Sequence, residues 1–287
     1  MKKLFYFACA AFTLSLASCN SDNNGNGTDN GKTDPSGVAK ESLVAYFPFD
    51  GDGVEKIANI TPKVEKVTFA EGRRGKGLKG AEGGYLLYDL PAGSVIRDLK
   101  GYSLAFWLKQ AAIPYEQAPV PMYFQITGAD HTWGNVSVSG DRLDAAADSL
   151  NFKNTFRKAG VEWENQFVGV AKPVFVAGKW SHYVIQYDNA KSEFKMYVNG
   201  VCPLDETKDE GIIKRYENAS QMALGDLKFV DADKIIIGGW LPKVVDGSND
   251  EWMGSFTGNM DELRVYSRAL TDAEVKALYD AEVENLN

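Results

Sequence analysis

The sequence predicts an all-β protein, a two-sheet antiparallel jelly-roll β-sandwich with one short C-terminal helix. Short segments rich in β-branched and aromatic residues recur between Gly, Asp, Asn and Pro, as strands do. These segments are 43–49, 84–90, 103–109, 122–128, 135–140, 167–178, 180–188, 194–200, 234–239 and 261–267. Only the stretch after residue 270 has a convincing helical pattern. Many strands with one terminal helix are typical of a sandwich, in which two sheets bury their apolar faces against each other.

Residues 1–18 are predicted to be a lipoprotein signal peptide. Lys2 and Lys3 precede an apolar run that is too short to span a bilayer, and "LASC" at its end has the spacing of a bacterial lipobox. We therefore expect Cys19 to carry lipid, whose acyl chains would anchor the chain without a transmembrane helix. An ordinary signal peptide with an incidental cysteine is the alternative.

A tether is predicted over residues 19–42. From Asn20 to Gly37 it reads "NSDNNGNGTDNGKTDPSG", which contains no side chain able to contribute to a core. The residues after Cys19 loosely resemble the Asp-rich signals that send some lipoproteins to the outer face of the outer membrane, although Asn dilutes the acidic run. We expect a lipid-anchored protein of the bacterial outer membrane that is exposed at the surface.

The charge of the chain limits its partners. The formal net charge is −8 at pH 7, and no basic run offsets it. Nucleic acid and anionic lipid would be repelled by such a surface. We therefore expect no nucleic-acid partner and membrane contact only through the N-terminal lipid, whereas uncharged sugars are not excluded.

The cysteines exclude a disulfide framework. Cys9 lies inside the signal peptide and Cys19 is the lipidation site, so Cys202 has no intramolecular partner in the mature chain. Cys202 is expected to be a buried or half-buried thiol and not a nucleophile, because His131 and His182 are far from it in sequence.

The C-terminal helix has a clear start signal. Thr271 and Glu274 have the spacing of a capping box, and Leu270 and Val275 can form a hydrophobic staple. Val275 and Leu278 fall on one face of the helix, which we expect to pack on the sandwich.

Several segments, taken in order, resemble a known family. They are "LVAYFPFDGDG", "VTFAEGRRGKGLKG", "GYLLY", "YSLAFWLK", "GKWSHYVIQYDNAKSEFKMYVNGV", "IIIGG" and "FTGNMDELRVYSRALTDAEVKALY". Their order and character resemble the laminin-G-like, concanavalin A-like lectin/glucanase jelly-roll family over nearly all of residues 43–287. The resemblance implies one domain of two curved antiparallel sheets packed face to face, with the first and last strands close together.

Two stretches are longer than the usual connections of this family. They are residues 110–177 and 201–234. Loops longer than about 12 to 15 residues inside a compact domain are usually functional or disordered, and these two contain too many aromatic residues for disorder. We expect these insertions to determine ligand specificity.

The tryptophans separate scaffold from candidate site. Trp107 and Trp180 lie in predicted strands and are expected in the core. Four others lie in or beside loops, flanked by polar residues or Gly: Trp133, Trp163, Trp240 and Trp252. An exposed indole offers a flat apolar face to a sugar ring, while nearby polar side chains bind its hydroxyls. These four are the candidate glycan-binding residues; the alternative is that each pins a loop.

Catalysis by paired carboxylates is not indicated. Retaining glycosidases hold two carboxyl groups about 5–5.5 Å apart, and the glucanase branch carries them as E-x-D-x-x-E on one strand, a pattern that is absent here. Glu162 and Glu164 in "EWENQF" would share one face of a strand, without a third acid in register. Motifs of serine hydrolases, zinc proteases and nucleotide-binding proteins are absent as well.

A structural calcium ion is the one cofactor that the sequence suggests. Calcium prefers six to eight oxygen ligands. The resemblance brings the first and last strands together, and many members of the family hold calcium, so Asp50 and Asp261 are the candidate ligands. Alternatively, these acids cap turns and accept backbone hydrogen bonds.

The closing strand, 261–267, is expected to have two different faces. Leu263 and Val265 alternate with Glu262 and Arg264. We expect the two apolar residues to face the core and the two charged residues to form an outward ion pair.

Three functional classes remain open. The leading one is a non-catalytic carbohydrate-binding module of a surface-tethered lipoprotein, which would catch poly- or oligosaccharide for neighbouring glycan-processing proteins. The others are a protein-interaction or adhesion module without a sugar site, and a glycoside hydrolase. Exposed tryptophans in a groove would favour the first, a large flat apolar patch the second, and a close carboxyl pair in a cleft the third.

Overall fold

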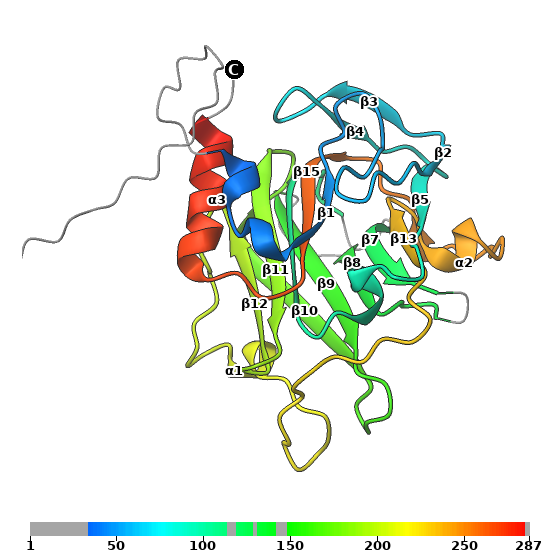
Figure 1. Ribbon diagram of the computed structural model, residues 1–287. Helices are drawn as coiled ribbons and strands as arrows, with labels where there is room; N and C mark the ends of the chain where they lie inside the picture. The colour runs from blue at the N-terminus through cyan, green and yellow to red at the C-terminus, as the bar shows by residue number, and fades with distance from the viewer. Residues whose placement is uncertain (1–33, 114–118, 129–130, 142–147, 285–287) are drawn as a thin grey trace, which may run out of the picture. The chain divides into compact units, whose positions relative to one another are not determined.

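The computed structural model describes residues 34–113, 119–128, 131–141 and 148–284 (Figure 1). The predicted signal peptide, the lipidation site Cys19 and most of the predicted tether lie outside these residues. Within them the all-β prediction is confirmed, because two antiparallel sheets form a sandwich. The described chain contains no helix long and apolar enough to cross a membrane.

One sheet has seven strands in the described chain. Six of them follow one another in the order β12 (Glu193–Val198), β11 (Ser181–Asp188), β6 (Tyr102–Lys109), β15 (Asn259–Tyr266), β4 (Lys76–Lys79) and β3 (Thr68–Glu71). The seventh, β1 (Leu43–Phe47), pairs with β15. The first and last strands of the sandwich are therefore neighbours, as the family resemblance implied.

The other sheet has eight strands in the part of the chain that the structure describes. Seven follow one another in the order β10 (Asn165–Val176), β9 (Ser149–Arg157), β8 (Val136–Asp141), β7 (Val120–Thr127), β13 (Lys234–Ile237), β5 (Tyr85–Asp89) and β2 (Lys63–Glu65). The eighth, β14 (Met253–Gly254), pairs with β7 in parallel, whereas the other strand pairs described are antiparallel.

The stretch 110–177, predicted as an inserted loop, is instead built mainly of strands β7 to β10. Phe124, Phe152, Phe156 and Val168 from these strands are buried in the core between the sheets. A segment that alternately buries its side chains in this way is part of the sandwich itself. The stretch 201–234 is a long connection up to the first residue of β13, as predicted, and contains the short helix α1 (Glu210–Ile213).

The predicted C-terminal helix is α3 (Asp272–Glu284). Its capping box is confirmed: the Glu274 N–H donates to Thr271 Oγ1 over 3.2 Å, and the Thr271 N–H donates to Glu274 Oε2 over 2.8 Å. Leu270 and Val275 are buried in one apolar cluster, as the predicted staple requires. Figure 1 shows α3 beside β11 and β12, with α2 (Leu241–Val244) at the opposite side of the sandwich, near β7 and β13.

The closing strand β15 contains a β-bulge. Leu263 and Val265 are buried between the sheets, as predicted. The register with β6 shifts between Asp261 and Arg264, and Glu262 takes a left-handed backbone conformation with a φ of 53°. Before the bulge β15 pairs with β4, and after it β15 pairs with β1. Strand β15 therefore has two successive pairing partners along one edge.

The predicted ion pair of Glu262 and Arg264 forms, with Nη2 2.6 Å from Oε2, but it is buried and not exposed as expected. Helix α3 covers this face of the sheet, and its Glu282 forms a second ion pair with Arg264. Trp107 donates its indole N–H to Glu282 Oε2 over 2.7 Å, so it lies under the helix and not between the sheets. Trp180, also expected in the core, is only half-buried. A buried charge is costly unless it is paired, so this network fixes α3 to the sheet.

His182 allows a pH test of this buried face. Its ring packs against Trp107 and is 1% exposed. Burial, and next the positive charge of Arg264, lower the pKa of His182 to about 3, so the ring is neutral in the folded protein. The unfolded chain takes up this proton near pH 6.5. The contribution to stability is therefore complete above pH 6.5 and is lost as the pH falls toward 3, by up to about 1.4 kcal/mol per pH unit.

We accordingly expect His182→Phe to lose less stability than the wild type on acidification. Thermal unfolding measured across the range from neutral pH to about pH 4 would reveal the difference as a flatter dependence of Tm on pH in the variant. An identical acid dependence in both proteins would contradict the neutral, buried state of His182.

Candidate functional site

Three of the four candidate tryptophans meet at one place on the eight-stranded sheet. The ring centroids of Trp133 and Trp252 are 5.4 Å apart, and Trp240 lies 5.2 Å from Trp252 and 6.4 Å from Trp133. Phe167 of β10 adds a ring at 90° to Trp133, 5.9 Å away. These separations are those of favourable aromatic pairs. The four rings form one continuous aromatic cluster.

Two connections and the short strand β14 position the indoles. Trp133 lies between β7 and β8, and the preceding carbonyl, that of Thr132, accepts a hydrogen bond from Trp240 Nε1 over 3.0 Å. Trp252 directly precedes β14, and its carbonyl accepts the N–H of Val120 over 3.0 Å. The parallel pairing of β14 with β7 thereby brings Trp252 to Trp133.

Two of these indoles reach solvent, and the third supports them. Trp252 is 40% exposed and Trp133 is half-buried, but Trp240 is only 2% exposed. Trp240 therefore presents no free face to a ligand, which corrects its prediction as a contact residue. It packs against Trp252 at an interplanar angle of 65° and is a positioning residue.

A pocket of about 210 Å³ opens beside the two exposed indoles. The described residues that line it come from β7, β8, β9, β14 and the β7–β8 connection: Val120, Trp133, Ser139, Gly140, Asp141, Lys153, Trp252 and Met253. The walls are apolar, while a hydroxyl, a carboxylate and an ammonium group supply polar contacts. Apolar walls with a few convergent polar groups are typical of small-molecule sites.

The polar groups of the pocket come from adjacent strands. Ser139 of β8 is the register partner of Lys153 of β9, and Asp141 lies two residues further along β8 on the same face. Lys153 Nζ lies 3.7 Å from Asp141 Oδ2, and the side chains are 47% and 35% exposed. Because both charged groups are open to solvent, a ligand hydroxyl can accept a hydrogen bond from one and donate to the other.

Four residues of the site were not predicted from the sequence: Ser139, Asp141, Lys153 and Phe167. A signal was present for the serine, because the alternation in "NVSVSG" places Val136 and Val138 on the core face and the serines on the other. The other three depend on the register of β8, β9 and β10, which the sequence pattern leaves open.

Trp163 is separate from the cluster. It lies in the turn that joins β9 and β10, is 42% exposed and, within the described residues, has no ring contact with the other three candidates. Glu162 and Glu164 lie in the same turn. The expectation that they share one face of a strand is therefore wrong. Glu164 Oε1 accepts a hydrogen bond from Arg157 Nε over 2.5 Å. Glu164 therefore helps to hold the turn together.

The groups considered for catalysis do not gather at the pocket. Asp141 is the sole carboxylate among the described residues that line it, whereas paired-carboxylate hydrolysis requires two. Cys202 is half-buried, as expected, and burial raises the pKa of its thiol. A thiol with a raised pKa is a poor nucleophile at neutral pH.

Asp50 and Asp261 both bind the turn between β3 and β4 through its backbone. Asp261 Oδ2 accepts the N–H groups of Arg73 and Arg74 over 2.8 and 2.9 Å. Asp50 Oδ1 accepts the N–H of Lys76 over 3.0 Å. Burial raises the pKa of Asp261 to about 8, against the opposing effect of the N–H groups that it accepts. These contacts are those of the turn-capping alternative.

The calcium ion stays a prediction, and the turn-capping contacts of Asp50 and Asp261 are its alternative. The described residues contain no group of three His, Cys, Asp or Glu side chains that could hold a metal. We expect the same Tm in millimolar calcium chloride as in EDTA, measured by calorimetry. A calcium-dependent rise in Tm that Asp50→Ala removes and the neighbouring Asp52→Ala keeps would establish the ion instead.

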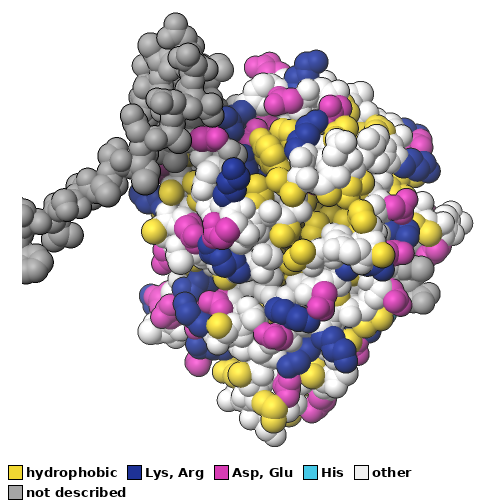
Figure 2. Space-filling model, in the orientation of Figure 1, with side chains coloured by type: hydrophobic (Ala, Val, Ile, Leu, Met, Phe, Trp, Pro, Cys, Tyr) yellow, Lys and Arg dark blue, Asp and Glu magenta, His cyan; other side chains and the backbone are white. Residues whose placement is uncertain are grey.

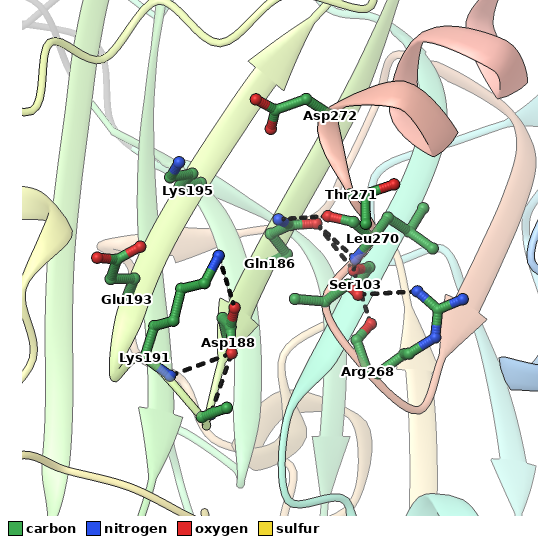
Figure 3. Close-up of polar contacts among 12 residues, drawn as sticks. Ser103, Gln186, Asp188, Lys191, Glu193, Lys195, Arg268, Leu270, Thr271 and Asp272 are labelled. Atoms are coloured by element: carbon green, nitrogen blue, oxygen red, sulfur yellow. Dashed lines mark hydrogen bonds and ion pairs between the residues drawn. The ribbon is translucent and has the colours of Figure 1, made fainter. Parts of the chain in front are cut away.

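A second, more polar cavity of about 390 Å³ lies on the seven-stranded sheet, where the chain enters α3. Figure 3 shows its polar lining, from Gln186 and Asp188 of β11, Glu193 and Lys195 of β12, and Leu270, Thr271 and Asp272. Gln186 Oε1 accepts the Leu270 N–H and its Nε2 donates to the Leu270 carbonyl, each over 3.0 Å. Lys195 pairs with Glu206 over 3.4 Å. The two bonds of Gln186 thus tie the start of α3 to β11.

Comparison with known proteins agrees with the fold. The family model described as the concanavalin A-like lectin/glucanases superfamily matches residues 82–231. The comparison with curated proteins gives no match.

Among solved structures, domain 4 of AbnA, a GH43 extracellular arabinanase from Geobacillus stearothermophilus, in complex with arabinotriose, has a TM-score of 0.50 at 21% identity, covering 83% of this chain and 98% of that one. The botulinum neurotoxin serotype D ligand binding domain in complex with N-acetylneuraminic acid has a TM-score of 0.55 at 11% identity, covering 84% and 52%. The receptor binding domain of the C/D mosaic botulinum neurotoxin has a TM-score of 0.55 at 11% identity, covering 83% and 51%. The chain thus matches about half the length of the toxin domains. At these identities the similarity is one of fold.

Proposed function

Because this chain belongs to the concanavalin A-like lectin/glucanases superfamily, we propose that it is a non-catalytic glycan-binding module. The observation that carries the proposal is the pocket walled by Trp133 and Trp252, with Asp141 and Lys153 at its polar side. A sugar ring has an apolar face that packs on an indole and hydroxyls that hydrogen-bond to a carboxylate or an ammonium group. This pocket offers both kinds of contact to a single sugar ring.

Two observations support binding without hydrolysis. The described lining of the pocket contains the carboxylate of Asp141 without a second one. Three similar solved structures are domain 4 of an arabinanase and two receptor- or ligand-binding domains of toxins. Both are consistent with a module that holds a glycan while another protein acts on it.

Nucleic acid is not proposed as a partner. Figure 2 shows Lys and Arg side chains interspersed with Asp and Glu around a hydrophobic area on one face. A nucleic acid requires a clustered basic footprint, and the net charge of −8 gives the opposite balance.

We further propose that lipid on Cys19 tethers this module to the outer membrane. The support is the "LASC" lipobox and the polar tether that follows it. At the surface the module would hold poly- or oligosaccharide close to neighbouring glycan-processing proteins. Cys19→Ser is expected to move the protein from the membrane fraction to the soluble fraction, and unchanged fractionation would remove this part of the proposal.

A broad glycan array tests the binding function. The purified protein is expected to bind at least one glycan, and Trp163→Ala, which leaves the pocket intact, is expected to give the same binding profile. The absence of binding to every glycan would remove the proposed function. Release of reducing sugar by the wild type, lost in Asp141→Asn, would show that the module is an enzyme.

A further inference from the structure

The strand beside the pocket, β10, carries an exposed ring and a glycine on one face. Gly169 is the register partner of Lys153, which lines the pocket. Phe167 lies two residues before Gly169 and therefore on the same face of the strand. Phe167 is 50% exposed and packs edge-on to Trp133. The aromatic wall of the pocket thus continues onto β10.

Gly169 lies beside open space, and its backbone conformation does not require a glycine. A Cβ atom at this position would have no heavy atom of the described residues within 4 Å. Its φ lies outside the left-handed region, so other residues could adopt the same conformation. A glycine inside a strand weakens that strand and often marks a site that a ligand approaches closely. Because Gly169 has no side chain, the surface of β10 beside Lys153 is open, and Phe167 borders this open area.

The charges of the pocket oppose an acidic ligand. Lys153 and Asp141 lie 3.7 Å apart, so a ligand carboxylate drawn to the ammonium group would also be repelled by the carboxylate. Hydroxyl groups do not have this conflict, because they both accept and donate hydrogen bonds. Ser139 adds a further hydroxyl on the same face. The polar chemistry of the site therefore selects uncharged sugars.

Resting on the proposed glycan-binding function, we propose that the site takes a chain of uncharged sugars that crosses β8, β9 and β10. One ring occupies the pocket beside Trp133 and Trp252, and the next ring lies over Gly169 with one face against Phe167. The residues that line the pocket contact the first ring only. Phe167 and Gly169 form a second subsite, which makes chain length the basis of selectivity.

Isothermal titration calorimetry of the purified protein tests this second subsite. The probes are the mono-, di- and trisaccharides of arabinose, xylose, glucose and mannose, with a galacturonic acid trisaccharide as the acidic probe. At least one uncharged trisaccharide is expected to bind about 3- to 10-fold more tightly than its monosaccharide, the range that one added aromatic contact provides.

Two variants separate the subsites. Phe167→Ala is expected to remove the gain from monosaccharide to trisaccharide, and Gly169→Leu is expected to remove it by filling the open area on β10. Val174→Ala is the matched control, because Val174 is 48% exposed on the same strand and lies outside the proposed subsite. Unchanged Tm values in the variants exclude a loss of folding.

The outcomes distinguish this proposal from the function on which it rests. Wild-type trisaccharide affinity in both Phe167→Ala and Gly169→Leu would overturn the second subsite and leave glycan binding standing. Tighter binding of the galacturonic acid probe than of any uncharged sugar would overturn the selection by charge. The absence of binding to all probes and to the glycan array would remove both the subsite and the proposed function.

Discussion

Changing Trp252 to Ala is expected to weaken glycan binding by about ten- to a hundred-fold, and Trp133→Ala is expected to do the same. Each indole forms a wall of the pocket. Losing the apolar contact of one large side chain costs about 1.5–3 kcal/mol, which corresponds to that range of affinity. Titration with the glycan that binds the wild type most tightly measures the loss.

Trp163→Ala is the matched control, since Trp163 and Trp252 are 42% and 40% exposed. Trp163 lies in the β9–β10 turn, so Trp163→Ala is expected to leave the affinity for the glycan unchanged. Trp240→Ala should instead lower the free energy of unfolding by about 3–5 kcal/mol, because it empties a buried site, and its loss of binding should accompany a lower Tm. Loss of binding in Trp163→Ala, with binding kept in Trp133→Ala and Trp252→Ala, would place the glycan site at the β9–β10 turn.

Arg264→Ala is expected to lower the free energy of unfolding by about 3–5 kcal/mol, because removing one partner leaves buried charges without compensation. Here Glu282, which is 0% exposed, loses its arginine partner, and Glu262, which is 3% exposed, keeps only the pair with Arg74 over 3.1 Å. In a domain of this size the change corresponds to a fall in Tm of about 6–20 °C. Calorimetry or denaturant unfolding followed by fluorescence measures it.

Arg268→Ala serves as the comparison for Arg264→Ala. The Arg268 side chain is 37% exposed and pairs with Glu41 and Glu274, so its loss should cost only about 0–1 kcal/mol. Replacing Arg264 together with Glu262 and Glu282 by apolar residues should recover part of the stability, because the three buried charges are removed together, while Arg74 and the Trp107 N–H lose their acceptors. Equal losses in the two arginine variants would show that burial of the network contributes little.

The sequence predicts the fold where local pattern and layer structure agree. The alternation of Leu263 and Val265 gives the inward face of β15, and the spacing of Thr271 and Glu274 gives the start of α3. Alternation does not reveal what covers the other face of a strand. Trp107 was therefore expected between the sheets, although the covering element is a helix that begins far away in the sequence.

The site was predictable in its aromatic residues and not in its polar ones. Tryptophan beside polar loop residues is an unusual composition, and three of the four candidates do meet. Asp141, Lys153 and Phe167 are ordinary strand residues, whose proximity comes from register between three strands. Register depends on the whole sheet, so a local pattern cannot supply it. The burial of Trp240 depends likewise on packing between distant segments.

The parallel strand β14 has a consequence for how the site responds to its ligand. Only two residues pair with β7, so the segment carrying Trp252 is fastened to the sheet by few backbone bonds. Segments of this kind detach more readily than the core strands of a domain. A sugar in the pocket, against both Trp252 and Trp133, would touch the segment and the sheet, and its binding free energy would oppose detachment. The glycan would thus act as a reversible cross-link, and the rim of the site would be stiffest when occupied.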